Sequence, residues 1–178
     1  DCPVINLGFS GNGKMDPEVG ALLAEVDAAV YVIDCAPNMP PEMITERTIP
    51  LVERLRAARP DTPIVLVECI SYQGGAFLPG ARAGHEEKNT ALRAEYERLV
   101  QKGVAGLDYV RGETLLGGDG EANVDGVHPT DLGFARIADA LEPALRKALG
   151  RWASVRGTGD PEGRVEHGVP GFITEAER

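Results

Sequence analysis

Four short apolar runs alternate along the chain with longer stretches in which apolar and polar residues are mixed. The runs are rich in Val and Ile and do not alternate with polar residues, which is typical of parallel strands covered on both faces. They predict strands at residues 4–7, 29–33, 64–69 and 107–110.

The mixed stretches carry apolar residues at helical spacing and predict helices at residues 16–26, 41–59, 86–102 and 132–149. The first begins with Asp16 and Pro17, an N-cap followed by a first-turn proline. Pro50 is expected to kink the second helix or to begin a new turn in it. The last helix is the clearest, because one face collects Phe134, Ile137, Ala138, Leu141 and Leu145. Strands that alternate with helices predict an α/β domain built on a parallel sheet.

The length of 178 residues is that of one domain. The regular pattern stops at Gly150, so we expect an α/β domain at residues 1–150 and a polar tail or strap at residues 151–178. A glycine-rich stretch at residues 71–84 follows a predicted strand. Ligands of open α/β sheets bind outside the carboxyl ends of the strands, so this stretch is a candidate wall of a pocket.

Composition excludes several classes of partner. The formal net charge of −10 repels phosphate backbones, so we expect no nucleic acid partner. No apolar run approaches the ~18 residues that a membrane span requires. The three cysteines, Cys2, Cys35 and Cys69, form no CxxC pair and are interpreted as ordinary thiols, with Cys35 and Cys69 buried, rather than as a disulfide framework or a zinc site. The chain begins at Asp1 without a signal peptide, so we expect the numbering to start at a processing site or inside a longer polypeptide.

A glycine-rich turn at residues 8–14 follows the first predicted strand and allows three interpretations. It matches most of the phosphate-binding loop GxxxxGK, but Met15 replaces the Ser or Thr that binds magnesium. It also resembles a GxSxG nucleophile elbow around Ser10, with Asn12 in place of the last glycine. Glycines can equally serve only to form a tight turn, and the segment alone favours this third interpretation.

A second candidate lies just before the last predicted helix. Asp125 stands three residues before His128 in a turn that contains Gly126, and a local turn can direct the carboxylate at one imidazole nitrogen. The other nitrogen is then free to take a proton from a hydroxyl nucleophile. His85 and His167 are expected to lie on the solvated surface.

Three motifs in this order resemble blocks of the SGNH (GDSL-type) esterases and acylhydrolases: VINLGFSGNG at residues 4–13, VYVIDCAPNM at residues 30–39 and DGVHPTDLGF at residues 125–134. The resemblance spans residues 4–149. It implies that His128 and Asp125 belong to a Ser-His-Asp triad and that Gly11 and Asn38 are the oxyanion donors. The Pro-Asn-Met sequence departs from the commoner Gly-x-Asn-Asp form but is similar to a bacterial subgroup.

The resemblance also implies a flavodoxin-like three-layer α/β/α fold with a parallel sheet. In this family the nucleophilic serine follows a strand that precedes the glycine block, and the chain contains no such segment before residue 4. We expect the serine and the first, central strand to lie upstream; supply by a second chain and loss of catalysis are the alternatives. Ser10 matches the position before the oxyanion glycine, not the nucleophile.

The sequence therefore predicts a serine ester hydrolase that cleaves short acyl esters, for example acetylated carbohydrates. Transfer of the acyl group to an acceptor other than water is the variant of this reaction. The resemblance implies no metal or cofactor. A nucleotide-binding kinase that uses residues 8–14 and a non-catalytic binding domain with the same fold are the alternative functions.

Overall fold

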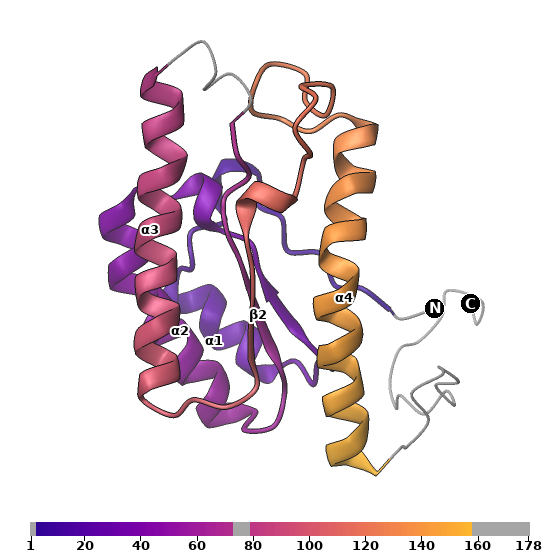
Figure 1. Ribbon diagram of the computed structural model, residues 1–178. Coiled ribbons are helices and arrows are strands. Elements are labelled where there is room, and N and C mark those ends of the chain that lie inside the picture. The colour runs from indigo at the N-terminus through magenta and orange to yellow at the C-terminus, as the bar shows by residue number, and fades with distance from the viewer. Residues whose placement is uncertain (1–2, 73–78, 158–178) are drawn as a thin grey trace, which may run out of the picture.

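The computed structural model describes residues 3–72 and 79–157, without the side chains of residues 79–83 (Figure 1). Three parallel strands form one sheet in the order β1 (Tyr31–Ile33), β2 (Ile64–Val67) and β3 (Leu107–Val110). The helices are α1 (Pro17–Glu25), α2 (Pro41–Ala58), α3 (Pro79–Gln101) and α4 (Asp131–Arg156), and the 3₁₀ turns are η1 (Ser10–Asn12), η2 (Ala36–Asn38) and η4 (Gly112–Thr114).

The helices cover the two faces of the sheet unequally. Helices α2 and α3 connect consecutive parallel strands, and right-handed crossovers in one direction place both on the same face. Helix α1 packs beside α2, while α4 follows the last strand and is, among the described residues, the only helix on the opposite face (Figure 1). This arrangement is a three-layer α/β/α fold with a parallel sheet, as predicted.

The central strand shows how the sequence builds both halves of the core. All four side chains of β2 are buried, which explains why the run is uniformly apolar. Ile64 and Leu66 join the cluster under α2 and α3, whereas Val65 and Val67 pack with Ile137 and other residues of α4. The alternation of a strand thus fixes which helix each residue contacts.

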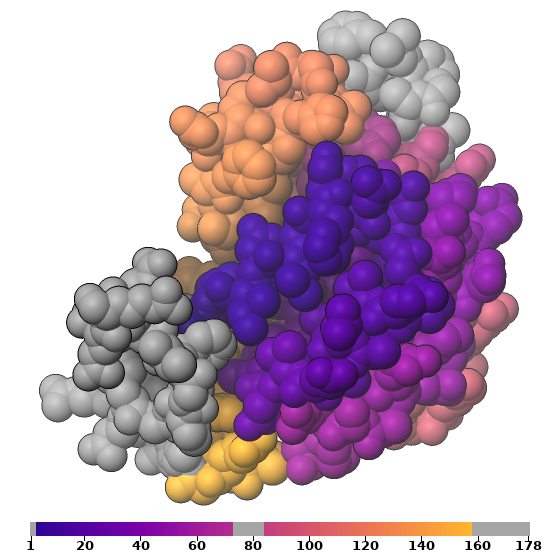
Figure 2. All heavy atoms as spheres, turned by 180° about the vertical axis from the view of Figure 1, so that it is seen from behind, coloured from indigo at the N-terminus to yellow at the C-terminus, as the bar shows by residue number. Residues whose placement is uncertain are grey.

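The predicted strand at residues 4–7 is wrong. These residues form no strand, and Val4 and Ile5 are 84% and 61% exposed. Seen from behind, the N-terminal segment lies on the surface of the molecule (Figure 2). Within the described residues β1 pairs only with β2, and residues 4–7 do not pair with its open edge.

Two helix boundaries differ from the predictions. Helix α3 begins at Pro79, so part of the predicted loop is helical and residues 73–78 lie outside the described residues. Helix α4 continues to Arg156, past the end predicted at residue 149, and stops at Gly157 with a left-handed φ of 72°. Residues 158–178 of the predicted tail lie outside the described residues, and the division at residue 150 stays a prediction.

One expectation within the helices also needs correction. Pro50 lies inside α2, which continues as one helix from Pro41 to Ala58, and the expected kink stays a prediction. Phe134 and Ala138 of the predicted apolar face of α4 are exposed, whereas Ile137, Leu141 and Leu145 do pack on the sheet. No helix in the described ranges is long and apolar enough to cross a membrane.

Candidate active site

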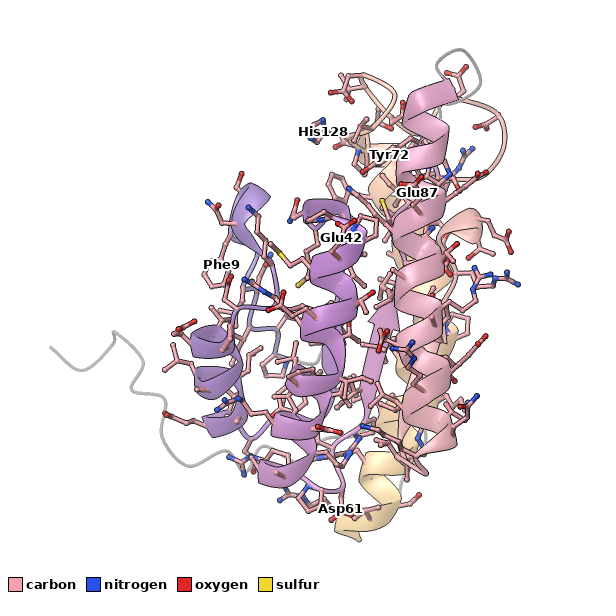
Figure 3. All side chains as sticks on the ribbon, turned by 90° about the vertical axis from the view of Figure 1, so that its left-hand side faces the viewer. Phe9, Glu42, Asp61, Tyr72, Glu87 and His128 are labelled. Atoms are coloured by element: carbon pink, nitrogen blue, oxygen red, sulfur yellow. The ribbon has the colours of Figure 1, made fainter. Side chains whose placement is uncertain are left out.

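Three of the four predicted site residues, Asn38, Asp125 and His128, lie in segments that follow the carboxyl ends of strands, whereas Gly11 lies in η1, which follows no described strand. Asn38 belongs to η2, which follows β1, and the loop that carries Asp125 and His128 follows β3 and η4. Figure 3 shows His128 at the end of the molecule opposite Asp61, which precedes β2. This edge is where parallel α/β sheets bind their ligands.

The carboxylate of Asp125 contacts both the ring and the backbone of His128. Its Oδ2 lies 2.7 Å from the imidazole Nδ1. Its Oδ1 accepts the backbone N–H groups of Val127 at 3.0 Å and of His128 at 2.8 Å. The pair predicted from the spacing of the two residues is therefore formed within a single turn.

Local sequence explains why the turn has this shape. Gly126 has a φ of 90°, which favours glycine, and its N–H donates to the Asn123 side chain at 2.9 Å. The backbone of Val124 donates to the His128 carbonyl at 2.8 Å, which closes the loop. Thr130 then caps α4 by accepting the Gly133 N–H at 3.2 Å. The histidine is thus held directly before a long helix.

The electrostatics of the pair suit proton transfer. The His128 backbone N–H, the His128 ring and the Val127 N–H together hold the pKa of Asp125 well below its usual range. An ionised Asp125 accepts the Nδ1 proton of a neutral imidazole and leaves Nε2 unprotonated. The His128 side chain is 78% exposed, so Nε2 can accept a proton from a hydroxyl group that enters the site.

Asn38 lies directly beside the turn that contains Gly11. Its Nδ2 donates to the carbonyl of Ser10 at 3.1 Å and to the carbonyl of Gly13 at 3.4 Å. The fold therefore brings the two predicted oxyanion donors to neighbouring turns. Ser10 and Asn38, which are in contact, are 28 residues apart in the sequence. Both amide hydrogens of Asn38 are directed at this turn.

The two donors do not point at a common position in this structure. The Ser10–Gly11 peptide is trans, so the Gly11 N–H points away from the side on which Asn38 contacts the Ser10 carbonyl. Ser10 has a φ of 55°, and a Cβ added to Gly11 would meet no atom within 4 Å. The roles of Gly11 and Asn38 stay predictions.

The turn is anchored on its far side by α2 and the core. Arg47 Nη1 donates to the Lys14 carbonyl at 2.9 Å and to Asp16 Oδ1 at 2.5 Å. Met15 has a φ of 54° and is buried in the core, which fixes the backbone between these contacts. Met15 replaces the magnesium-binding residue of a phosphate loop, and here it is a core residue.

A buried carboxylate network at the end of β2 has no counterpart in the sequence-based predictions. Glu68 is 2% exposed; its Oε1 accepts Arg93 Nη2 at 2.6 Å and the Tyr109 hydroxyl at 2.7 Å. Its Oε2 accepts the Gly112 N–H at 2.8 Å. The network ties the ends of β2 and β3 to α3. The signal in the sequence is a lone carboxylate inside an apolar run.

His85 is buried, so the prediction that it lies on the solvated surface is wrong. Its ring packs edge-on against Tyr72, with centroids 5.3 Å apart, and its Nδ1 accepts the Tyr72 N–H at 3.4 Å. The early start of α3 places His85 on the same helical face as Asn89 and Leu92, which are also buried. His167 lies outside the described residues.

The cysteines behave as ordinary thiols where they are described. Cys69 is buried and Cys35 partly buried, and burial raises the pKa of both thiols. Neither forms a disulfide, and Cys2 lies outside the described residues. The described part of the chain contains no group of three or more His, Cys, Asp or Glu side chains placed to hold a metal ion.

An open hollow of about 720 Å³ lies beside α4, away from these residues. It is lined by residues of the loop after β3 and of α4, including the ion pair between Arg136 and Asp119, whose side chains lie 2.6 Å apart. None of Gly11, Asn38, Asp125 and His128 lines it.

Comparisons with known proteins agree with the fold. The family model of the GDSL-like Lipase/Acylhydrolase family matches residues 1–146. A crystal structure from Bacteroides ovatus ATCC 8483, assigned as a GDSL-like lipase, is 43% identical, with a TM-score of 0.78 over 82% of this chain and 43% of that chain. No curated protein matches the chain.

Two more distant crystal structures share the fold at 18% identity. The salicylyl-acyltransferase SsfX3 from a tetracycline biosynthetic pathway gives a TM-score of 0.66 over 80% of this chain and 44% of that chain. A Bacteroides fragilis NCTC 9343 protein assigned as an acylhydrolase gives a TM-score of 0.50 over 68% of this chain and 62% of that chain. The chain thus spans less than two thirds of the length of each of these three proteins.

Proposed function

Because the chain belongs to the GDSL-like lipase/acylhydrolase family, we propose that it forms most of the active site of a serine ester hydrolase. The observation that carries the proposal is the 2.7 Å contact between Asp125 and His128 at the carboxyl edge of the sheet. An exposed histidine held by an ionised carboxylate is the acid–base half of a serine triad.

In the proposed reaction a serine hydroxyl attacks the carbonyl carbon of an acyl ester, and Nε2 of His128 takes the hydroxyl proton. Asp125 stabilises the imidazolium that results. The imidazolium returns the proton to the leaving alcohol, which yields an acyl-serine. Water activated by the same histidine then hydrolyses the acyl-serine, releases the acid and restores the serine.

Asn38 and Gly11 are the proposed donors to the tetrahedral oxyanion. Asn38 Nδ2 now donates to the Ser10 carbonyl at 3.1 Å and to the Gly13 carbonyl at 3.4 Å. Rotation of the Ser10–Gly11 peptide would turn the Ser10 carbonyl away from Asn38, free an amide hydrogen of Asn38 and bring the Gly11 N–H to the same side. Glycine permits this rotation because it accepts positive φ. Losing one donor of such a pair typically lowers kcat by ~10²–10³.

The nucleophile is proposed to come from a segment encoded before Asp1. The chain contains Ser10, Ser71 and Ser154, and within the described residues none of them bonds to His128. In the described part of the chain no strand pairs with the outer edge of β1, and Val32 in this strand is 43% exposed, which suits an added strand. The 43% coverage of the B. ovatus structure leaves room for one.

The proposed substrates are short acyl esters, and acetylated carbohydrates are one class of these. An acceptor other than water would make the same site an acyltransferase, the activity that the name of the SsfX3 neighbour states for that protein. The kinase alternative gains no support, because α1 begins only at Pro17 and Met15, which stands where such a loop binds magnesium, is buried in the core.

A fluorophosphonate probe tests the proposal in the full-length protein, because it bonds covalently to an activated serine. We expect labelling at one serine before Asp1, hydrolysis of p-nitrophenyl acetate, and loss of both in His128→Ala. Labelling of Ser10 would instead make residues 8–14 the nucleophile turn. A protein that carries an upstream serine block but shows neither labelling nor hydrolysis is a non-catalytic binding domain.

A further inference from the structure

The side chain of Lys88 connects α3 to the turn that carries Asn38. Its Nζ donates to the carbonyl oxygen of Pro37 at 2.7 Å, across 51 residues of sequence. Pro37 is the middle residue of η2, and its carbonyl belongs to the same peptide as the nitrogen of Asn38. The contact therefore acts directly next to the proposed oxyanion donor.

The sequence leaves the Pro37 carbonyl without a local backbone partner. A turn would satisfy this oxygen with an N–H three or four residues later, and those positions are Pro40 and Pro41. The neighbouring carbonyls are satisfied: Cys35 accepts from Asn38 at 3.0 Å and Ala36 from Met39 at 3.2 Å. A charged donor from another element takes the place that proline cannot fill.

Lys88 is itself held in place. Its ammonium group lies 5.9 Å from the centroid of the Tyr72 ring, within reach of a cation–π contact. The next residue, Asn89, bonds to both backbone groups of Cys69, at 2.8 Å and 2.9 Å. Helix α3 is thus fixed to the end of β2 at the level of Lys88, and the lysine can transmit that position to η2.

We propose that Lys88 is a positioning residue for Asn38, an inference that rests on the proposed oxyanion role of Asn38. Lys88 holds the Pro37–Asn38 peptide, so that the Asn38 amide keeps its place beside the turn at Ser10. Without this contact η2 can shift, and small displacements of catalytic groups are costly, with ~10²-fold losses for displacements of about 1 Å.

A double-mutant cycle in the full-length enzyme tests the proposal. Asn38→Ala is expected to lower kcat for p-nitrophenyl acetate by ~10²–10³. Lys88→Met is expected to lower kcat by about tenfold or more with little change in KM, and Lys88→Arg, which keeps a charged donor, restores part of the loss. In the Asn38→Ala background Lys88→Met should have no further effect.

Lys102→Met is the matched control, because Lys102 directly follows α3 and bonds to Glu53 on α2 at 2.9 Å, away from η2. The kcat of the Lys102→Met enzyme should stay unchanged. Thermal melts test whether each variant is folded. If Lys88→Met does not fold, Lys88→Gln replaces it in the double-mutant cycle. An equal loss from the Lys88 substitution in both backgrounds, or none in the presence of Asn38, overturns the positioning role alone. An Asn38→Ala enzyme with full kcat removes the oxyanion assignment itself.

Discussion

The carboxylate of Asp125 holds His128 at three points: at the imidazole Nδ1, at the His128 backbone N–H, and through the N–H of the intervening Val127. One oxygen serves the backbone and the other the ring. The residue that orients the histidine therefore also shapes the turn that carries it. Separating these two tasks is possible by substitution.

Asp125→Asn should abolish most activity while preserving the fold. The amide oxygen can still accept the two backbone N–H groups, but an NH₂ group facing Nδ1 favours the tautomer with its proton on Nε2, which cannot act as a base. We expect kcat to fall by ~10³–10⁴ with a near-unchanged melting temperature. Asp131→Asn, in the first turn of α4, is the matched control. Retention of a tenth or more of kcat would contradict the triad role of Asp125.

The same contacts predict how the Asp125 carboxyl titrates. Its pKa in the folded protein is lowered, chiefly by the His128 N–H, so the ionised form stabilises the turn at pH values above the ordinary aspartate pKa of about 3.9. That stabilisation is lost as the pH falls below this value and through the lowered pKa. Carboxyl ¹³C NMR should therefore show Asp125 ionised at pH 3.9. In His128→Ala the titration should move upward but stay below the ordinary value, because two backbone donors remain. A midpoint at or above 3.9 in the unmodified protein contradicts the geometry.

Two glycines of one turn allow a matched test of the oxyanion assignment. A Cβ at Gly11 meets no atom within 4 Å, so Gly11→Ala should fold normally. Rotation of the Ser10–Gly11 peptide would bring residue 11 to positive φ, which costs an alanine ~1–2 kcal/mol, so kcat should fall by about tenfold or more. Gly13→Ala, whose Cβ would lie 3.7 Å from Asn38 Nδ2, should leave kcat unchanged. Equal activities of the two variants would mean that the Gly11 peptide does not rotate in catalysis.

Glu68 should matter for stability. Glutamine can supply only one acceptor, so Glu68→Gln leaves either the Gly112 N–H or the Arg93 and Tyr109 donors without a partner. The partial exposure of Arg93 moderates the cost, and we expect the free energy of unfolding to fall by ~2–3 kcal/mol in urea titrations followed by circular dichroism. Glu97→Gln, exposed on α3, should change it by less than ~0.5 kcal/mol. A similar small change in Glu68→Gln would show that water replaces the lost partners.

The fold was predictable where the pattern of apolar residues in a segment alone indicates what that segment packs against. The run of β2 is uniformly apolar, which predicts that the strand is buried, and it is buried. The helical spacing of Ile137, Leu141 and Leu145 likewise predicts the buried face of α4, and these residues pack on the sheet. The run at residues 4–7 carries the same signal, yet a strand also needs a paired neighbour; Val4 and Ile5 are exposed and pair with no strand of the described residues. Apolar pattern alone does not reveal whether the partner is present.

The contacts of the candidate site also fall into those that the sequence predicts and those that depend on the tertiary fold. Asp125 and His128 are three residues apart, so one turn forms their contact and sequence spacing suffices to predict it. The Lys88 contact with Pro37 joins segments 51 residues apart, and only the packing of α3 on the sheet brings them together. The absence of an N–H at Pro40 and Pro41 indicates that a partner is needed but does not say which residue provides it.

The unpaired edge of β1 yields a prediction about the upstream segment. Parallel pairing directs the Tyr31 N–H to the Pro63 carbonyl at 3.0 Å, so the N–H of Val32 points to the opposite, open edge. In the 178-residue chain this amide should exchange with deuterium orders of magnitude faster than that of Leu66 in the central strand. In a protein that includes the sequence encoded before Asp1, an added strand would accept the Val32 N–H and slow its exchange to the rate of the core strands. Unchanged, fast exchange in the longer protein would exclude a strand at this edge, and with it the proposed route by which the serine reaches His128.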